Sequence, residues 1–150
     1  MKAVIQRVNQ ASVEIENEIW GEIEKGLLIL LGIEDADNIE DVEWLSGKIS
    51  RLRIFADENG VMNLPITDVG GGVLLISQFT LHASTKKGNR PSYIKAAQPE
   101  IAIPLYEKFK AQLEKDIKIK VQTGKFGAYM KIASINDGPA TIIIDTRDKQ

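Results

Sequence analysis

The sequence contains no cysteine, which excludes disulfides, thiolate nucleophiles, iron–sulfur clusters and cysteine-based zinc sites. Histidine occurs once, as His82, so histidine-rich metal sites and two-histidine motifs are also excluded within one chain. The longest unbroken apolar run, residues 27–31, is too short to cross a bilayer, and the N-terminal residues turn polar too early for a signal peptide. We therefore expect a cytoplasmic protein that contacts no membrane and needs neither a metal nor another cofactor.

The chain also has no large excess of positive or negative charge. Nineteen basic residues against twenty-one acidic ones leave a net charge of −2. A long groove that follows many phosphates is therefore not expected, although a protein that grips only the end of an RNA needs just a few local cations. One basic, glycine-containing segment stands out, Lys86-Lys87-Gly88-Asn89-Arg90, with Lys95 shortly after it. A solvated surface loop is the simplest interpretation of such a cluster.

The length of 150 residues suits one domain, and no repeat, low-complexity tract or linker divides residues 1–150. Alternating or continuous apolar runs predict strands, in chain order, over residues 4–16, 19–24, 26–33, 53–55, 73–76, 117–121, 130–135 and 140–145. The run at 26–33 is almost wholly apolar, which is typical of a strand buried on both faces.

Two further segments have helical spacing. Apolar residues at three- and four-residue steps predict a helix over residues 39–52, with Asn38 as its cap and Asp41 in its first turn. A second apolar stripe predicts a helix over residues 102–113, with Pro99 near its start, although Pro104 would remove a hydrogen bond there. Strands adjacent at both ends of the chain predict a mixed α+β (α/β) domain, with mostly antiparallel or mixed sheets and two main helices on one side.

Side chains that usually carry catalysis are hard to find. His82 has no recognisable acidic partner for a Ser-His-Asp arrangement, and an exposed loop imidazole is the simpler interpretation. No phosphate-binding glycine motif occurs, and the three glycines at 70–72 are more typical of a loop with unusual backbone angles. Carboxylates are scattered over the chain, so no pair is nominated for acid–base catalysis.

Two local features remain as candidates. The first is a strand end that carries hydroxyl and amide groups, Ser77, Gln78 and Thr80, around Phe79. Backbone N–H groups at a strand end can form an oxyanion hole without a side-chain base, although a plain polar terminus is the simpler interpretation. The second is residues 136–141, where glycine before proline marks a tight connection. It is either an ordinary turn or a place where glycine lets backbone carbonyls approach a ligand closely.

A series of short motifs runs through the chain in a fixed order. It comprises Val4-Ile5-Gln6-Arg7-Val8, Gly26-Leu27-Leu28, Arg53-Ile54-Phe55, Met62-Asn63-Leu64, Ser77-Gln78-Phe79-Thr80-Leu81, Gly88-Asn89-Arg90-Pro91-Ser92-Tyr93, Thr123-Gly124-Lys125-Phe126-Gly127-Ala128-Tyr129-Met130 and Asn136-Asp137-Gly138-Pro139-Ala140-Thr141. In these motifs the sequence resembles, from end to end, the D-aminoacyl-tRNA deacylases, formerly called D-tyrosyl-tRNA deacylases. It departs from that family at Asn89, where a bulkier residue is frequent, at Ala140, where valine is common, and at Pro104.

The resemblance implies a barrel-like sheet and a homodimeric hydrolase that cleaves the ester between a D-amino acid and the terminal adenosine of tRNA. Glycine has no side chain and is expected to be accepted too, including glycine mischarged on tRNA-Ala. The dipeptide Gly138-Pro139 would be cis and would enter the active site of the partner subunit, so that the site lies at the subunit interface. There its carbonyl oxygens would hold the α-amino group and leave no room for an L side chain.

The site residues implied by the resemblance fall into two groups. The catalytic wall comprises Ser77, Gln78, Phe79 and Thr80, whose backbone N–H groups, with the Thr80 hydroxyl, would lie near the scissile carbonyl. The substrate-binding group comprises Gly138, Pro139, Arg7, Phe126, Met130 and Ala102. Within it, Arg7 would brace the Gly138-Pro139 segment, with Phe126 and Met130 packed beside it, and Ala102 would lie near the adenine.

Two mechanisms remain open. Thr80 is a possible nucleophile, but a threonine without an evident base is poorly activated. Attack by water, assisted by the neighbouring ribose hydroxyl of the RNA, is favoured, with the protein supplying position and charge stabilisation. The rival interpretations are a non-catalytic module that binds an RNA end or a small ligand, and a loop that serves only dimer formation. Release of free amino acid separates an enzyme from both.

Overall fold

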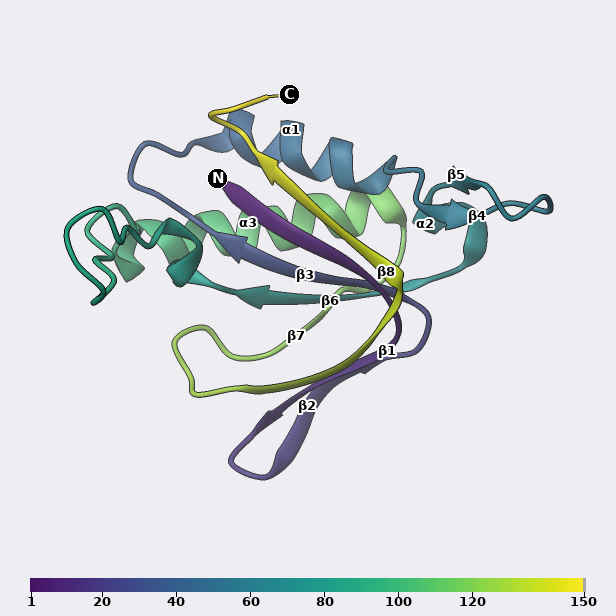
Figure 1. Cartoon of the computed structure of the whole chain (residues 1–150), viewed down its shortest axis with the longest axis horizontal. Helices are drawn as coiled ribbons and strands as arrows, with labels where there is room; N and C mark the ends of the chain where they lie inside the picture. Colours follow the sequence, from purple (N-terminus) through teal and green to yellow (C-terminus); the bar gives the residue numbers. More distant parts are fainter. Residues whose placement is uncertain (150) are drawn as a thin grey trace.

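Two long antiparallel strands, β1 (Lys2–Ile15) and β8 (Lys131–Asp145), run through the computed structural model, which describes residues 1–149. The other strands are β2 (Glu18–Ile23), β3 (Gly26–Gly32), β4 (Phe55–Ala56), β5 (Met62–Leu64), β6 (Gly72–Ser77) and β7 (Gln122–Thr123). The helices are α1 (Ile39–Ser50), α2 (Ile66–Val69), α3 (Pro99–Ile117) and the 3-10 helix η1 (Phe79–His82). Figure 1 shows the long strands lying across α1 and α3.

The main sheet is mixed and strongly curled. Its strand order is β2-β1-β3-β6-β7, and β8 pairs with β1 in addition. β1 is antiparallel to β2, β3 and β8, whereas β3 and β7 run parallel to β6. The first and last strands of this order, β2 and β7, lie close together. A Cβ added to Gly21 of β2 would lie 2.9 Å from the Thr123 carbonyl oxygen of β7. The predicted barrel-like, mixed sheet is thus confirmed.

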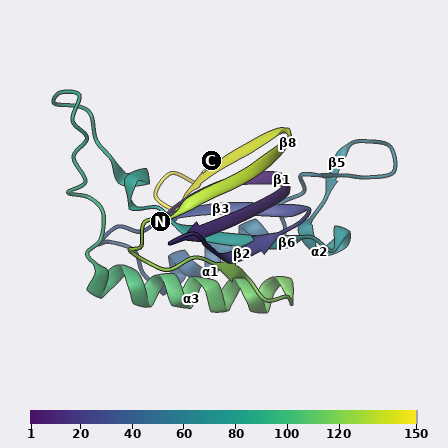
Figure 2. The same cartoon turned by 90° about the horizontal axis from the view of Figure 1, so that it is seen from below.

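Both long helices lie on one side of the sheet, as predicted (Figure 2). The N-terminus of α1 has a capping box: Asn38 Oδ1 accepts the N–H of Asp41 at 3.3 Å, and Asp41 Oδ2 accepts the N–H of Asn38 at 3.0 Å. Pro99 occupies the first turn of α3, and Pro104 lies inside the helix on its exposed side, where it supplies no backbone N–H to the helix. No helix among residues 1–149 is long and apolar enough to cross a membrane.

The two faces of the central strands bury different apolar clusters. Residues 27, 29 and 31 of β3, with 73 and 75 of β6, pack with the buried faces of α1 and α3. The alternate residues 28, 74 and 76 pack inside the curled sheet, because successive side chains of a strand point to opposite faces. β3 is therefore buried on both faces, as its continuous apolar sequence predicts.

Two strand predictions are wrong: one segment does not form a strand, and one strand lies at other residues than predicted. Residues 117–121 do not form a strand, because α3 continues to Ile117, which is buried on the same helical stripe as Leu113. Lys118 then ends the helix in a left-handed conformation, with φ +60°. The strand predicted at 53–55 is displaced to β4, which pairs with β5.

The strands predicted at 130–135 and 140–145 are one strand, β8. Both halves pair with β1 in the same antiparallel direction, which a chain-reversing turn would not allow. Asn136 lies opposite Val8, but Thr141 lies opposite Gln6, so the residues between them leave the ladder as a bulge. The predicted turn is therefore a projection from the middle of a strand.

Candidate active site

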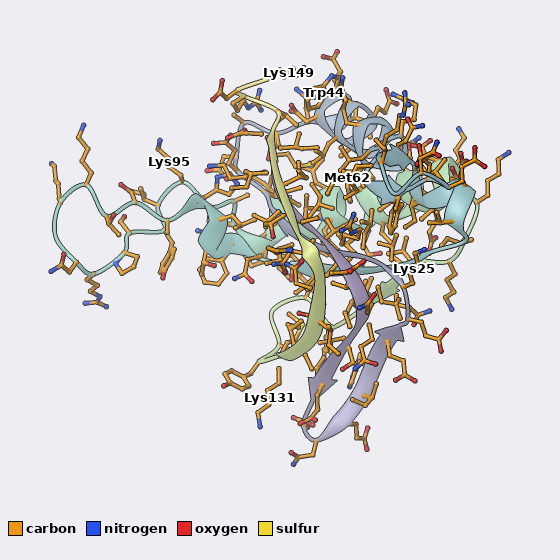
Figure 3. All side chains as sticks on the ribbon, turned by 45° about the vertical axis from the view of Figure 1, so that its right-hand side comes forward. Lys25, Trp44, Met62, Lys95, Lys131 and Lys149 are labelled. Carbon is orange, nitrogen blue, oxygen red and sulfur yellow. The ribbon has the colours of Figure 1, made fainter. Side chains whose placement is uncertain are left out.

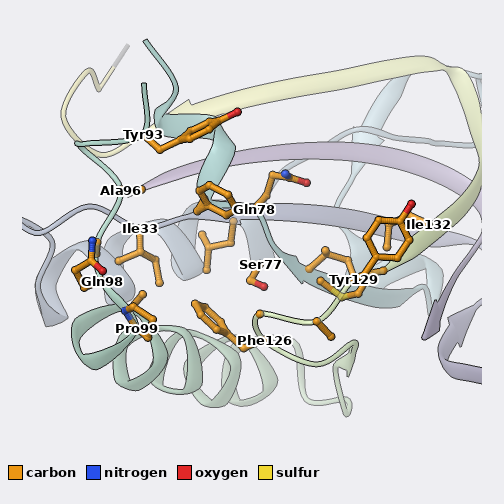
Figure 4. A pocket seen from close by; sticks show the side chains of 18 residues that line it. Ile33, Ser77, Gln78, Tyr93, Ala96, Gln98, Pro99, Phe126, Tyr129 and Ile132 are labelled. Carbon is orange, nitrogen blue, oxygen red and sulfur yellow. The ribbon is translucent and has the colours of Figure 1, made fainter. Parts of the chain in front are cut away.

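A cleft of about 500 Å³ opens where β3 and β6 end. Four segments line it: the end of β3, the end of β6 with the start of η1, the residues that lead into α3, and residues 126–132. Figure 4 shows Ser77 near the middle of this group, between Phe126 and Gln78. The motif at the end of β6 thus meets a segment nearly fifty residues later in the chain.

The lining of the cleft is uncharged. Among the described residues that form it there is no aspartate, glutamate, lysine, arginine or histidine. Its polar side chains are Ser77, Gln78, Gln98, Tyr93 and Tyr129. The described lining therefore offers neutral hydrogen-bond donors and acceptors.

The end of β6 is held in place by its neighbour. The Gln78 N–H donates to the Leu31 carbonyl of β3 at 2.7 Å, and the Gln78 side-chain amide donates to the Thr80 hydroxyl oxygen. η1 begins at the next residue, Phe79. The first N–H groups of a helix have no acceptor within that helix, and those of Phe79 and Thr80 have no other backbone acceptor among residues 1–149. They are backbone donors beside Ser77 and Gln78.

Aromatic side chains form the rim. Phe79 is 55% exposed and makes an edge-to-face contact with Tyr93, with ring centroids 5.0 Å apart. Tyr129 is 84% exposed and comes from the segment on the other side of the opening. Exposed aromatic faces next to a cleft are suited to stacking on a planar ligand. Tyr93 and Tyr129 were not predicted as site residues from the sequence, although they belong to the motifs at residues 88–93 and 123–130.

A buried tyrosine of α3, Tyr106, connects β6 to the lining residue Phe126. The Tyr106 hydroxyl of α3 donates to the Leu75 carbonyl at 3.0 Å, and its ring contacts Phe126 edge to face at 5.7 Å. Burial, with a smaller contribution from Glu107, raises the pKa of Tyr106, so the hydroxyl stays protonated and remains a donor. The sequence stripe identified Tyr106 as a core residue of the helix but not as a support for Phe126.

The segment around Gly138-Pro139 is exposed but firmly held. The peptide bond is cis and Gly138 has φ +128°. The Arg7 guanidinium donates to the Asp137 carbonyl at 3.0 Å and to the Ile54 carbonyl, and only 11% of the Arg7 side chain is exposed. At the other end, the Ala140 N–H donates to Asn136 Oδ1 at 3.1 Å.

The structure separates the predicted site residues into two places. Ser77, Gln78, Phe79, Phe126, Met130 and Ala102 line the cleft. Thr80 is not among the lining residues, but its hydroxyl accepts a hydrogen bond from the lining residue Gln78. Arg7, Gly138 and Pro139 are not part of the lining, and they form a separate surface of the same chain.

His82 is buried, so the expectation of an exposed loop imidazole is wrong. It is the last residue of η1 and turns inward beside Gly32, where a Cβ would lie 3.1 Å from His82 Cδ2. The missing side chain of Gly32 leaves the room for this ring. His82 Nε2 has no hydrogen-bond partner among residues 1–149, and the residue does not line the cleft.

Known proteins match the chain over almost its whole length. A family model described as D-Tyr-tRNA(Tyr) deacylase matches residues 4–145. A protein of Flavobacterium psychrophilum named D-aminoacyl-tRNA deacylase is 64% identical over 150 residues, which is all of both chains. A protein with the same name from Parabacteroides distasonis is 57% identical over the same length.

Two solved structures have a similar fold. One, titled c-Myc DNA Unwinding Element Binding Protein, superposes with a TM-score of 0.91 at 40% identity, over 97% of this chain and 99% of that one. The other, described as a probable eukaryotic D-amino acid tRNA deacylase, has a TM-score of 0.81 at 15% identity, over 95% and 97% of the two chains. At 15% identity the likeness concerns the fold alone.

Proposed function

Because this chain belongs to the D-Tyr-tRNA(Tyr) deacylase family, we propose that it hydrolyses the ester between a D-amino acid and the 3′-terminal adenosine of tRNA. The products are the free D-amino acid and the tRNA. The observation that carries the proposal is the uncharged cleft at the junction of β6 and η1. An aminoacyl ester is more reactive than an amide, so a site that only positions water and stabilises charge is sufficient for it.

The reaction begins with attack of water on the ester carbonyl. The backbone N–H groups at the start of η1 stabilise the negative charge that develops on the carbonyl oxygen. The neighbouring ribose hydroxyl orients the attacking water. The bond to the ribose oxygen then breaks, and that oxygen takes up the proton that the attacking water releases. Thr80 assists as a hydrogen-bond donor held by Gln78, because the described lining contains no base that would activate it as a nucleophile.

The other lining residues hold the two ends of the substrate. Ala102 is buried in the wall formed by α3, and its small side chain leaves space for the adenine. Phe126 and Met130 form the apolar part of the cleft against which the amino-acid end packs. Apolar walls of this kind exclude bulk water and strengthen the hydrogen bonds to the reacting carbonyl.

A homodimer completes the site, with Gly138-Pro139 of each copy in the cleft of the other. This part of the proposal is supported by the position of the pair, which is exposed on a surface that does not line its own cleft. Apolar side chains flank the segment on both sides, with Ile135 51% and Ile143 68% exposed. A self-complementary surface on a two-fold axis would cover both isoleucines and insert both loops.

Selection against L-amino acids follows from exclusion. Carbonyl oxygens of the Gly138-Pro139 segment accept hydrogen bonds from the substrate α-amino group, and an L side chain would collide with the same segment. A D side chain points away from it. Glycine lacks a side chain and passes the filter, so glycine mischarged on tRNA-Ala is also a substrate. We assign this reaction to the cytoplasm, where charged tRNA is used.

The test is a single-turnover assay with D-tyrosyl-tRNA, L-tyrosyl-tRNA and glycyl-tRNA-Ala, following release of the labelled amino acid. We expect rapid release from the D and glycyl substrates and release near the buffer rate from the L substrate. Retention of D-tyrosyl-tRNA without release would identify a binding module instead. An intact dimer that neither binds nor cleaves the RNA would leave the Gly138-Pro139 loop a purely structural element.

A further inference from the structure

Positive charge is segregated in one segment that borders the cleft. Residues 69–99 contain four cations, Lys86, Lys87, Arg90 and Lys95, and no aspartate or glutamate. The rest of the chain carries fifteen cations against twenty-one carboxylates. The near-neutral total therefore conceals a strongly cationic segment on an otherwise acidic protein.

The four cations stand on one projection, which we call the basic loop (residues 84–95). Two backbone hydrogen bonds between Ser84 and Ser92, of 2.8 and 2.9 Å, close its base. Residues 85–95 are all exposed. Figure 3 shows the loop standing away from the body of the fold, with Lys95 near its base.

The cations of the basic loop have no internal partners. None of the ion pairs within residues 1–149 involves Lys86, Lys87, Arg90 or Lys95, and none of these side chains donates a hydrogen bond there. No carboxylate on the loop screens them. Holding several like charges together on one loop is unfavourable in the free protein and becomes favourable when a polyanion neutralises them.

The basic loop is joined directly to the rim of the cleft. Tyr93, at the end of the loop, lines the cleft, and its carbonyl accepts the Ala96 N–H at 2.9 Å. The following Ala97 N–H donates to the Ile33 carbonyl at 2.9 Å, which fastens this return segment to the body of the fold. Four residues from the base at Ser84 to the tip at Gly88 give a reach of roughly 13 Å at about 3.3 Å per residue.

We propose that the basic loop binds the phosphates of the nucleotides that precede the terminal adenosine of the bound tRNA. This rests on the proposed function, since the terminal nucleotide is taken to occupy the cleft. The loop then meets the RNA backbone where it leaves the rim. Contacts to phosphates carry no sequence information, so the loop contributes affinity and register for any tRNA rather than choice among tRNAs.

The salt dependence of binding follows from the number of cations. Each phosphate contact adds about 0.7 to 0.9 to the slope of log affinity against log salt. Three or four contacts give a total slope of roughly −3, which is modest compared with proteins that follow a long groove. Removing three of the four cations brings the slope close to −1.

The experiment compares two variants with equal loss of charge. The loop variant is Lys86→Gln/Lys87→Gln/Arg90→Gln, which leaves Lys95, next to the cleft, in place. The matched control is Lys108→Gln/Lys115→Gln/Lys120→Gln, on exposed positions of α3 and the residues after it. Binding of uncharged tRNA is measured over a salt series, and kcat and KM are measured for D-tyrosyl-tRNA and for D-tyrosyl-adenosine, which lacks the preceding phosphates.

We expect the loop variant to bind uncharged tRNA at least about tenfold more weakly at low salt. Its slope of log affinity against log salt should be about −1. Its KM should rise for D-tyrosyl-tRNA with kcat little changed, and neither constant should change for D-tyrosyl-adenosine. The control variant should behave like the unaltered protein. Equal tRNA affinity and equal slopes for the loop variant and the control would overturn the proposal. If the unaltered protein cleaves neither ester, the proposed function fails, yet the binding of uncharged tRNA still decides the role of the basic loop.

Discussion

At the scale of single residues, Gly138 has a backbone conformation that other residues rarely adopt. Its φ is +128°, and a Cβ there would lie 2.5 Å from Arg7 Nη2. We expect Gly138→Ala to displace the loop and the Arg7 side chain and to lower kcat/KM for D-tyrosyl-tRNA by about 100-fold or more, with about 1–3 kcal/mol lost in stability. Activity on L-tyrosyl-tRNA should not appear. Kinetics and denaturant unfolding measure the two effects.

Gly60 provides the matched control for that substitution. It also has a positive φ, +76°, but no atom lies within 4 Å of its added Cβ, and it is part of an exposed turn. Gly60→Ala should therefore lower stability through the backbone alone and leave deacylation unchanged. If the Gly138→Ala variant deacylates D-tyrosyl-tRNA as fast as the Gly60→Ala variant, the Gly138-Pro139 loop has no role in the site.

Thr80 tests the chemical mechanism at the same scale. Its hydroxyl accepts a hydrogen bond from Gln78, and no base in the described lining is available to activate it. Thr80→Ala should reduce kcat by no more than about tenfold, the effect of one lost hydrogen bond, and Thr80→Ser should restore it. A loss of several orders of magnitude, or an acyl group trapped on Thr80 and detected by mass spectrometry, would identify a nucleophile.

At the scale of elements, the N-terminus of α1 is tied to the end of the chain by a carboxylate. Burial raises the pKa of Asp41, but hydrogen bonds from Thr146 and the Asn38 N–H, with the charge of Arg147, outweigh burial and lower it below the ordinary value of 3.8. A lowered folded-state pKa contributes stability that is complete above pH 3.8 and is lost as pH falls towards the folded value.

This predicts how the stability of α1 depends on pH. Asp41→Asn should lower the free energy of unfolding by about 1 kcal/mol at neutral pH, because the capping box is weakened. The difference from the unaltered protein should shrink below about pH 4, as measured by urea unfolding at several pH values. Asp35→Asn, on an exposed carboxylate nearby that takes no part in the capping box, should leave the free energy of unfolding at neutral pH almost unchanged. A difference for Asp41→Asn that persists unchanged to pH 3 would refute the assignment.

At the scale of the whole molecule, the proposal that two chains share each site makes mixing informative. Ala102→Phe fills the cleft of its own chain, and Gly138→Ala damages the loop that serves the other chain. Each variant alone should be inactive. After the two are unfolded and refolded together in equal amounts, half of the dimers are mixed and each has one intact site, so about a quarter of the full activity should return. If native mass spectrometry detects mixed dimers but no activity returns, the cleft and the loop of a site belong to the same chain and the shared-site proposal is wrong.

The sequence by itself determined the elements whose signals are local. The cap of α1 was predicted from Asn38, with Asp41 in the first turn, because a helix cap depends on neighbours in the chain. The two-sided burial of β3 was predicted from a single apolar run. The strand β6 was also predicted, because residues 73–76 form a continuous apolar run. The membership of the family follows from motifs spread over the whole chain.

Tertiary structure alone decided how these parts meet. Ile117 continues a helix rather than starting a strand, because its burial on the stripe of α3 outweighs the local alternation of residues 117–121. Residues 137–140 bulge from one strand, because pairing with β1 on both sides holds the chain in a single direction. The burial of His82 depends on space left by Gly32, fifty residues away in sequence. The cleft, and its separation from Gly138-Pro139, likewise arise from contacts between distant segments, which no local pattern encodes.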